Sequence, residues 1–115
     1  MSVGWETSDR SDGVLVELTG ELDISSASSV ESRLMEVEQR EPERLILDLR
    51  RVNFIDSTGL SMIINADGRA KKAGRRFTIV SGEGVPRRIL HTVGLEDRLD
   101  VLSDMPEQST PNGTA

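Results

Sequence analysis

The residues best suited to chemistry form one short polar stretch, Asp56-Ser57-Thr58-Gly59, directly before an apolar segment with helical spacing. A serine at a helix start lies beside backbone N–H groups that lack partners, and the helix dipole makes that end electropositive. A phosphate on this hydroxyl would add a charge of about −1.5 to −2 and three acceptor oxygens. The helix end would stabilise that charge, whereas Asp56 and Asp23 would repel it. A phosphate at this position would therefore preserve the local fold but sharply change the surface that a partner meets.

The same residue types also have a purely structural explanation. Ser, Thr and Asp before an apolar run are common helix caps, and an acid is favoured beside the positive end of the dipole. A second polar segment, Gly-Glu-Leu-Asp at residues 20–23, follows an apolar run with strand character. In open α/β sheets, functional residues gather at the carboxyl ends of parallel strands. We therefore expect the two segments to be neighbours if their strands are adjacent.

Catalytic alternatives have little support in the sequence. A serine hydrolase with Ser57 as nucleophile needs a base, and the single histidine, His91, is expected to face solvent on a short helix. That helix is expected to bury Ile89, Leu90 and Val93. The Gly-x-Ser-x-Gly elbow is absent, and Thr58 interrupts the Asp-Ser/Thr-Gly pattern of aspartic proteases. With no cysteine and one histidine, thiolate and multi-imidazole metal sites are excluded. We expect no enzymatic activity, no metal and no cofactor.

Length and charge narrow the class of protein further. The 115 residues fit one domain, and the net charge of −6 argues against nucleic acid as a partner. No apolar run approaches the roughly 20 residues that span a bilayer, and residues 1–10 do not resemble a signal peptide. We therefore expect a cytoplasmic protein without a membrane partner.

Periodicity predicts the elements that must position the polar segments. Period-2 and continuous apolar patterns predict strands at residues 14–18, 45–49 and 77–80, with an antiparallel partner at 2–8 across the turn at 11–13. Helical spacing predicts helices after residue 23, at 57–73 ending at Gly74, and at 86–93. Residues 99–102 fit either a strand or a helix.

Details of the two longer helices can also be predicted. The first is expected to bury Ala27, Val30, Leu34 and Val37, and the second Leu60, Ile63, Ile64 and Ala70. The first helix could be capped by Asp23, Ser25 or Ser26, or by a capping box of Ser28 and Glu31.

These elements predict an α/β domain over residues 1–103 and a disordered tail over 104–115. The sheet is expected to be mixed but mostly parallel, with four to five strands, an N-terminal antiparallel hairpin and three to four helices.

Taken together, residues 18–23, 47–49 and 54–60 resemble the STAS domains of bacterial anti-sigma factor antagonists. The resemblance runs from about Val14 to Leu102 and includes Arg-Arg-Ile-Leu at 87–90 and Gly-Leu at 94–95. It implies the layered STAS fold. It also implies that Ser57, the serine after the aspartate, is phosphorylated by an anti-sigma factor that is a serine kinase; Thr58 beside it is a second hydroxyl.

The resemblance further implies a switch. The unmodified form binds the anti-sigma factor and frees its sigma factor, the phosphorylated form does not bind, and a phosphatase restores it. The implied partner-binding residues are Glu21, Asp23, Asp56, Ser57, Thr58 and Gly59. Small apolar residues are common after this first loop in the family, whereas this chain has Ile24-Ser25-Ser26, which bears on the partner recognised. The alternatives are a STAS component of a larger signalling or lipid-transport assembly, or a small serine-dependent hydrolase.

Overall fold

The computed structural model describes residues 3–108, which form five strands and three helices. In chain order they are β1 (Val3–Arg10), β2 (Gly13–Leu22), α1 (Ala27–Glu38), β3 (Arg44–Ile55), α2 (Ser57–Ala73), β4 (Arg76–Val80), α3 (Val85–Thr92) and β5 (Asp100–Leu102). Residues 99–102, which fitted either a strand or a helix, thus contribute the last strand.

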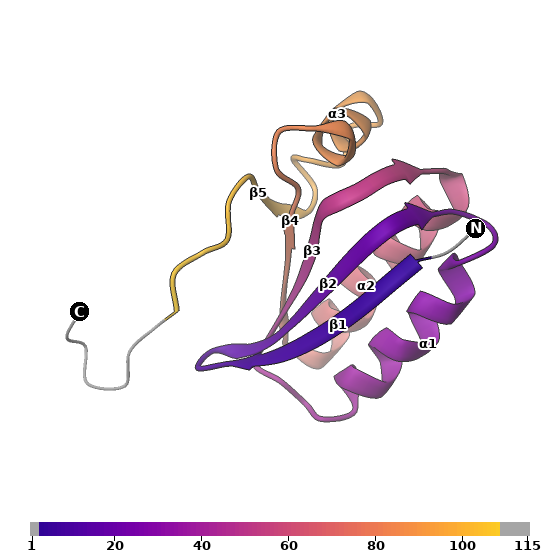
Figure 1. Ribbon diagram of the computed structural model, residues 1–115. Helices are drawn as coiled ribbons and strands as arrows, with labels where there is room; N and C mark the ends of the chain where they lie inside the picture. The colour runs from indigo at the N-terminus through magenta and orange to yellow at the C-terminus, as the bar shows by residue number, and fades with distance from the viewer. Residues whose placement is uncertain (1–2, 109–115) are drawn as a thin grey trace.

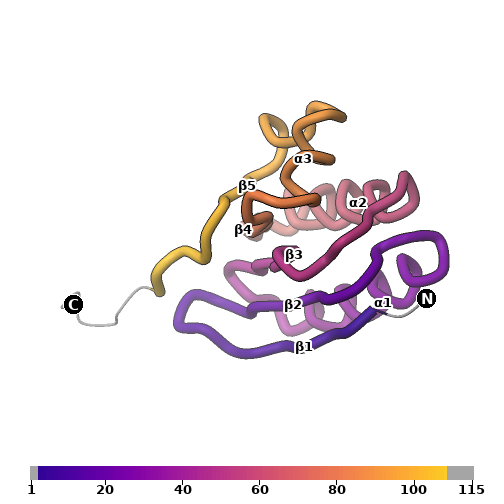
Figure 2. Tube along the Cα trace, turned by 45° about the horizontal axis from the view of Figure 1, so that its top comes forward, coloured from indigo at the N-terminus to yellow at the C-terminus, as the bar shows by residue number. Residues whose placement is uncertain are grey.

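The five strands form one sheet in the order β1-β2-β3-β4-β5. β1 pairs with β2 antiparallel, and every other neighbouring pair is parallel. Figures 1 and 2 show α1 and α2 on the same side of the sheet, whereas α3 lies past the end of β4. The predicted mixed, mostly parallel α/β fold with an N-terminal hairpin is confirmed.

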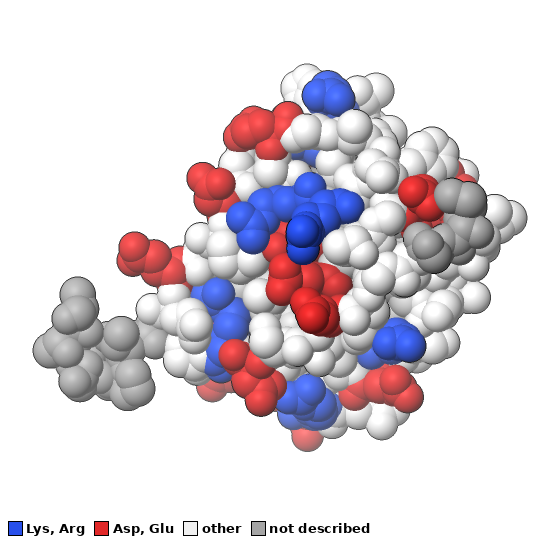
Figure 3. Space-filling view, viewed as in Figure 1, with Lys and Arg blue, Asp and Glu red and all other residues white. Residues whose placement is uncertain are grey.

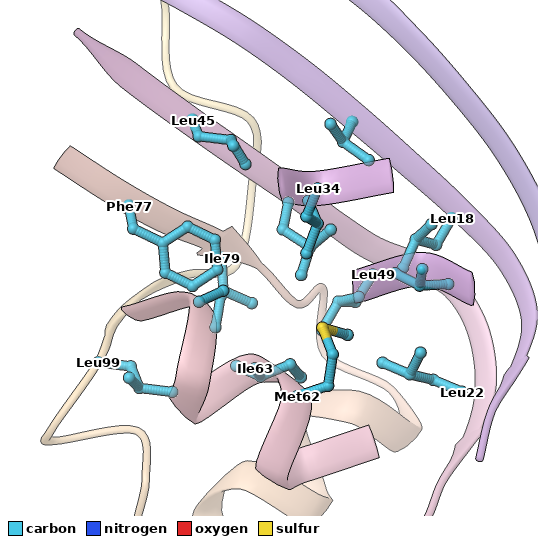
Figure 4. Packing of buried hydrophobic residues seen from close by; sticks show 14 of the residues in the cluster. Leu18, Leu22, Leu34, Leu45, Leu49, Met62, Ile63, Phe77, Ile79 and Leu99 are labelled. Carbon is cyan, nitrogen blue, oxygen red and sulfur yellow. The ribbon is translucent and has the colours of Figure 1, made fainter. Parts of the chain in front are cut away.

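The hydrophobic core lies between the sheet and the two longer helices. Strand residues such as Leu18, Leu47 and Ile79 meet helix residues such as Leu34 and Ile63, and all five are almost completely buried. Figure 4 shows these layers of aliphatic side chains pointing toward one another. Because aromatic residues are scarce, the core consists mainly of Leu, Ile, Val and Met side chains.

α1 buries the four residues predicted from its spacing, but the predicted capping box is wrong. The helix begins after Ser26, whose hydroxyl donates to the Glu21 carbonyl oxygen at 2.8 Å and makes no side-chain cap. Ser28 is exposed, and neither it nor Glu31 makes the capping contact.

α2 runs from Ser57 to Ala73 as predicted, and Gly74 ends it with a φ of 71° in the left-handed region that glycine adopts without strain. Its predicted buried face is partly wrong, because Ile64 is 43% exposed and Met62 and Ala66 face the sheet beside Ile63. In α3, Leu90 is buried as predicted, but Val93 is exposed because the helix has already ended at Thr92.

β3 is much longer than the predicted strand at 45–49. β3 has one extra residue opposite the step from Glu17 to Thr19 of β2. It has another opposite the step from Gly20 to Glu21. These two β-bulges change the alternation, so the buried residues after Leu47 are spaced by two and then by three: Leu49, Val52 and Ile55. Phe54 and Ile55, expected in a loop, therefore lie in the strand.

The segment after β5 continues toward the hairpin at the N-terminal end of the sheet. Arg10 Nη2 donates to the Pro106 carbonyl oxygen at 2.9 Å, and the Ser11 N–H donates to Gln108 Oε1 at 2.7 Å. Residues 109–115 of the predicted disordered tail lie outside the described residues, so the boundary at 103–104 stays a prediction.

A partly buried ionic network joins this end of the sheet. Asp12 accepts from Arg10 Nε at 3.0 Å and from Arg44 Nη1 at 3.3 Å. Arg44 also donates to the Thr78 hydroxyl, which donates to Asp100 Oδ2 at 2.6 Å. Burial opposes ionisation of Asp12, but the hydrogen bonds and charge from Arg10 and the hydrogen bond from Arg44 outweigh it, and its pKa lies below the usual 3.8.

We expect Asp12→Asn to lower stability at pH 7 and to make stability less dependent on pH in acid. Because the folded-state pKa of Asp12 is lowered, its contribution is fully present above the unfolded value and is lost as the pH falls below about 4. Urea denaturation at pH 7 and pH 3 measures this, with the exposed Asp97→Asn as control. Equal acid sensitivity of Asp12→Asn and the wild type would contradict the prediction.

Candidate functional site

The carboxyl ends of β2 and β3 lie side by side, at the right of Figure 1. Glu21 is paired with Phe54 and Leu22 with Ile55, and the Asp56 N–H donates to the Leu22 carbonyl oxygen at 3.2 Å. The expected neighbourhood of the two polar segments is confirmed. One detail is corrected: residues 20–22 belong to β2 and not to a loop, and Gly20 has a φ of 95° next to the second bulge.

The Asp56 carboxylate joins the two segments. Its Oδ1 accepts from the Gly59 N–H at 3.0 Å, which caps α2, and its Oδ2 accepts from the Ile24 N–H at 3.1 Å. Asp56 is therefore the N-cap of its own helix and at the same time fixes the loop that follows β2.

The loop after β2 is held by hydrogen bonds of its own. Asp23 Oδ1 accepts from the Ser25 hydroxyl at 2.6 Å and from the Ser25 N–H at 2.9 Å. The Ser25 hydroxyl is the main cause of a lowered pKa of Asp23, although burial opposes the shift. The carboxylate predicted to meet a partner thus also fixes its own loop, while Glu21 is half-buried at the end of β2.

Ser57 and Thr58 are the first two residues of α2, and both side chains are exposed. Within residues 3–108, no protein group hydrogen-bonds the Ser57 hydroxyl. Their backbone N–H groups belong to the first turn, where helices have no internal acceptor. The arrangement leaves the hydroxyl accessible to another protein at an electropositive helix end.

Gly59 provides the close approach between α2 and β2. A Cβ atom at this position would lie 2.4 Å from the Leu22 carbonyl oxygen. Gly59, which was predicted to bind a partner, is therefore buried in the framework that supports the site and is not part of its exposed surface.

Two exposed apolar residues lie beside these polar groups, and the sequence analysis named only Ile24, within the segment that bears on the partner recognised. Ile24 is 78% exposed and Phe54 is 48% exposed. An isoleucine among serines and an aspartate is the signal that points to the first residue. No such signal points to Phe54, which lies beyond the strand predicted at residues 45–49.

The remaining chemical candidates lie elsewhere. His91 is exposed and its Nδ1 pairs with Glu96 Oε1 at 2.5 Å, so its partner is an acid after α3 and not Ser57. Among residues 3–108, no cluster of three His, Asp or Glu side chains could hold a metal ion. None of the helices that these residues form is long and apolar enough to cross a membrane.

Comparison with known proteins agrees with this fold. The profile of the STAS domain family matches residues 5–107. The chain belongs to the STAS domain family. This STAS domain is 27% identical over 111 residues to the anti-sigma-F factor antagonist RsfB of Mycobacterium tuberculosis, covering 95% of this chain and 88% of RsfB.

Two further comparisons show the range of proteins that share the domain. The crystal structure of an anti-sigma factor antagonist from Mycobacterium paratuberculosis superposes with a TM-score of 0.83 at 25% identity, covering 90% of this chain and 88% of that one. The putative sulfate transporter YvdB of Bacillus subtilis is 32% identical over 78 residues, or 68% of this chain and 15% of the transporter. RsfB and the Mycobacterium paratuberculosis protein are both named as anti-sigma factor antagonists, whereas YvdB is named as a putative transporter.

Two substitutions of Asp56 should separate its two hydrogen bonds. Asp56→Asn keeps one acceptor oxygen and the good cap, so the Ile24 N–H loses its acceptor while the Gly59 N–H keeps one. Asp56→Ala loses both, at a cost of about 0.5–2 kcal/mol in stability. Amide hydrogen exchange should accelerate at Ile24 in both variants and at Gly59 only in Asp56→Ala. Unchanged exchange at Ile24 in Asp56→Asn would show that the bridge does not fix the loop.

Proposed function

We propose that this STAS domain is an anti-sigma factor antagonist controlled by phosphorylation of Ser57. The accessible Ser57 hydroxyl, at the first residue of α2 and beside the end of β2, carries the proposal. The antagonists named among its relatives support the class of partner.

In the proposed cycle, the unmodified domain binds a cognate anti-sigma factor, which then releases its sigma factor. The anti-sigma factor is also a serine kinase: the Ser57 oxygen attacks the γ-phosphorus of ATP, ADP leaves, and the hydroxyl proton passes to a base of the kinase. A phosphatase hydrolyses the phosphoserine and restores the binding form. The domain is thus a substrate and a competitor, and it acts in the cytoplasm, where its proposed partner controls transcription.

The energetics require Ser57 to lie within the contact. Changing the ratio of bound to free domain from 99:1 to 1:99 takes about 5.5 kcal/mol of differential affinity. A charge outside the interface is inadequate, since exposed ion pairs contribute about 1 kcal/mol or less. A dianion that must lose water next to Asp23 and Asp56 supplies an effect of the required size. Glu21 and Thr58 are proposed to complete the contact surface.

A second candidate function rests on the similarity to YvdB, in which such a domain is a small part of a larger protein. In that case the STAS domain would be a subunit of a signalling or transport assembly. Native co-purification separates the two candidates, since a kinase-like partner supports antagonism and transporter subunits support the assembly. A hydrolase remains the weakest alternative, because His91 pairs with Glu96 and, among the described residues, no side chain hydrogen-bonds the Ser57 hydroxyl to activate it.

The direct test uses the purified domain and each candidate anti-sigma factor. Calorimetry with ADP should give a complex, and incubation with ATP should add the mass of one phosphate per chain and dissolve that complex. Fragment masses then locate the phosphate. Absence of binding to every candidate, or a phosphate located on any residue other than Ser57, would refute the proposal.

A further inference from the structure

Ile24 is the most exposed of the large hydrophobic side chains in the described part of the chain. It is 78% exposed, compared with 43–48% for the other four such residues, Met35, Phe54, Ile64 and Val93. It also lies at the candidate site, because its N–H is bonded to the cap of the helix that begins with Ser57.

The backbone around Ile24 is fixed on both sides. Asp56 Oδ2 holds the Ile24 N–H from α2, and the Asp23 carboxylate holds Ser25 from within the loop. The Ser26 hydroxyl accepts from the Asp23 N–H at 3.0 Å and donates to the Glu21 carbonyl oxygen. The exposed side chain is therefore presented by an ordered loop, which lowers the entropy lost when a partner covers it.

The surroundings of Ile24 fit a contact centre. Polar residues adjoin it, namely Asp23 and Ser25 in the loop and Asp56 and Ser57 across from it. An apolar anchor within a polar rim is typical of the residues that dominate interface energies. By contrast, Figure 3 shows basic and acidic side chains next to one another near the middle of the face that it presents. In β3, Arg50 and Asp48 form an ion pair at 2.9 Å.

We propose that Ile24 is the main apolar anchor of the partner contact, inserting into an apolar pocket on the anti-sigma factor. The inference rests on the proposed function and deepens it. Continuity with Ser57 identifies the occupant as the same partner, and the acids Glu21, Asp23 and Asp56 predict a basic rim around that pocket. This position explains how phosphorylation acts, because a dianion beside the anchor must be dehydrated whenever the anchor is buried.

The test compares three variants after the wild type has been shown to bind an anti-sigma factor. By calorimetry with ADP, Ile24→Ser should weaken binding about tenfold or more, whereas Ile24→Leu should keep most of the affinity. Met35→Ser, an exposed apolar residue on α1, is the matched control and should bind like the wild type. The kinase should still phosphorylate Ile24→Ser at Ser57. The KM of the kinase for this variant should be higher than for the wild type, whereas its kcat should be the same.

The outcomes distinguish this inference from the proposed function. If the wild type binds and Ile24→Ser binds within about twofold of it, the inference is wrong and the proposed function stands. If the wild type binds no anti-sigma factor, both are wrong. If sedimentation shows that the wild type self-associates through Ile24, the residue belongs to an interface between copies, and the inference is again overturned.

Discussion

Ser57→Asp should weaken binding to the anti-sigma factor by about 100-fold, within the range for an unpaired charge buried at an interface. The phosphorylated wild type should lose more, about 10⁴-fold, because its group carries nearly twice the charge. An acid at the first helical position interacts favourably with the positive end of the helix dipole. The melting temperature of Ser57→Asp should therefore stay the same or rise. Calorimetry together with thermal unfolding separates loss of contact from loss of fold.

Ser57→Ala provides the complementary measurement. It should bind like the wild type, since the described residues give the hydroxyl no hydrogen bond to lose, and it should accept no phosphate. Thr58→Ala is the matched control for the phosphorylation assay, since it removes the neighbouring exposed hydroxyl, and it should still accept one phosphate. If Ser57→Ala is phosphorylated to one group per chain at the wild-type rate, the modified residue is a different one.

Gly59→Ala should destabilise the domain by about 1–3 kcal/mol and also reduce partner binding. The new methyl group would lie 2.4 Å from the Leu22 carbonyl oxygen, and neither backbone moves easily because the Asp56 N–H is bonded to that same oxygen. The N-terminus of α2 must then shift away from β2, which displaces Ser57. Urea denaturation and calorimetry measure the two effects.

Gly68→Ala on the same helix is the control for Gly59→Ala. Gly68 is exposed, and a Cβ atom there would meet nothing within 4 Å. Its replacement should stabilise the domain by about 0.8–1 kcal/mol through helix propensity alone. The two glycines should therefore respond with opposite signs, and a stabilising Gly59→Ala would show that the close approach to β2 is not needed.

The elements that follow one periodicity could be predicted from the sequence. α1 has a regular apolar stripe, and α2 begins after a capping acid and ends at a glycine, so local rules determine both ends. The second half of β3 could not be predicted, because its bulges place Leu49, Val52 and Ile55 at spacings of three. A bulge depends on the neighbouring strand, and no local pattern records it.

The site was predictable to a similar degree. Ser57 and Asp56 stand out because residue type and helix start coincide, and their exposure and capping follow. The second hydrogen bond of Asp56, to the Ile24 N–H, could not be predicted because it joins residues that meet only after the sheet has formed. For Ile24, the polar neighbours in the sequence are the one signal, because its exposure results from how the loop is fixed.

The bulges in β3 also restrict how this protein can change in evolution. Between Asp48 and Ile55, β3 contains two residues more than β2 contains between their paired residues, Glu17 and Leu22. Deleting one residue there would reverse which side chains point inward and would turn the start of α2 away from its neighbour. Changes in the length of this interval should therefore be tolerated far less than changes in its residue types. Insertions or deletions should accumulate elsewhere in the chain.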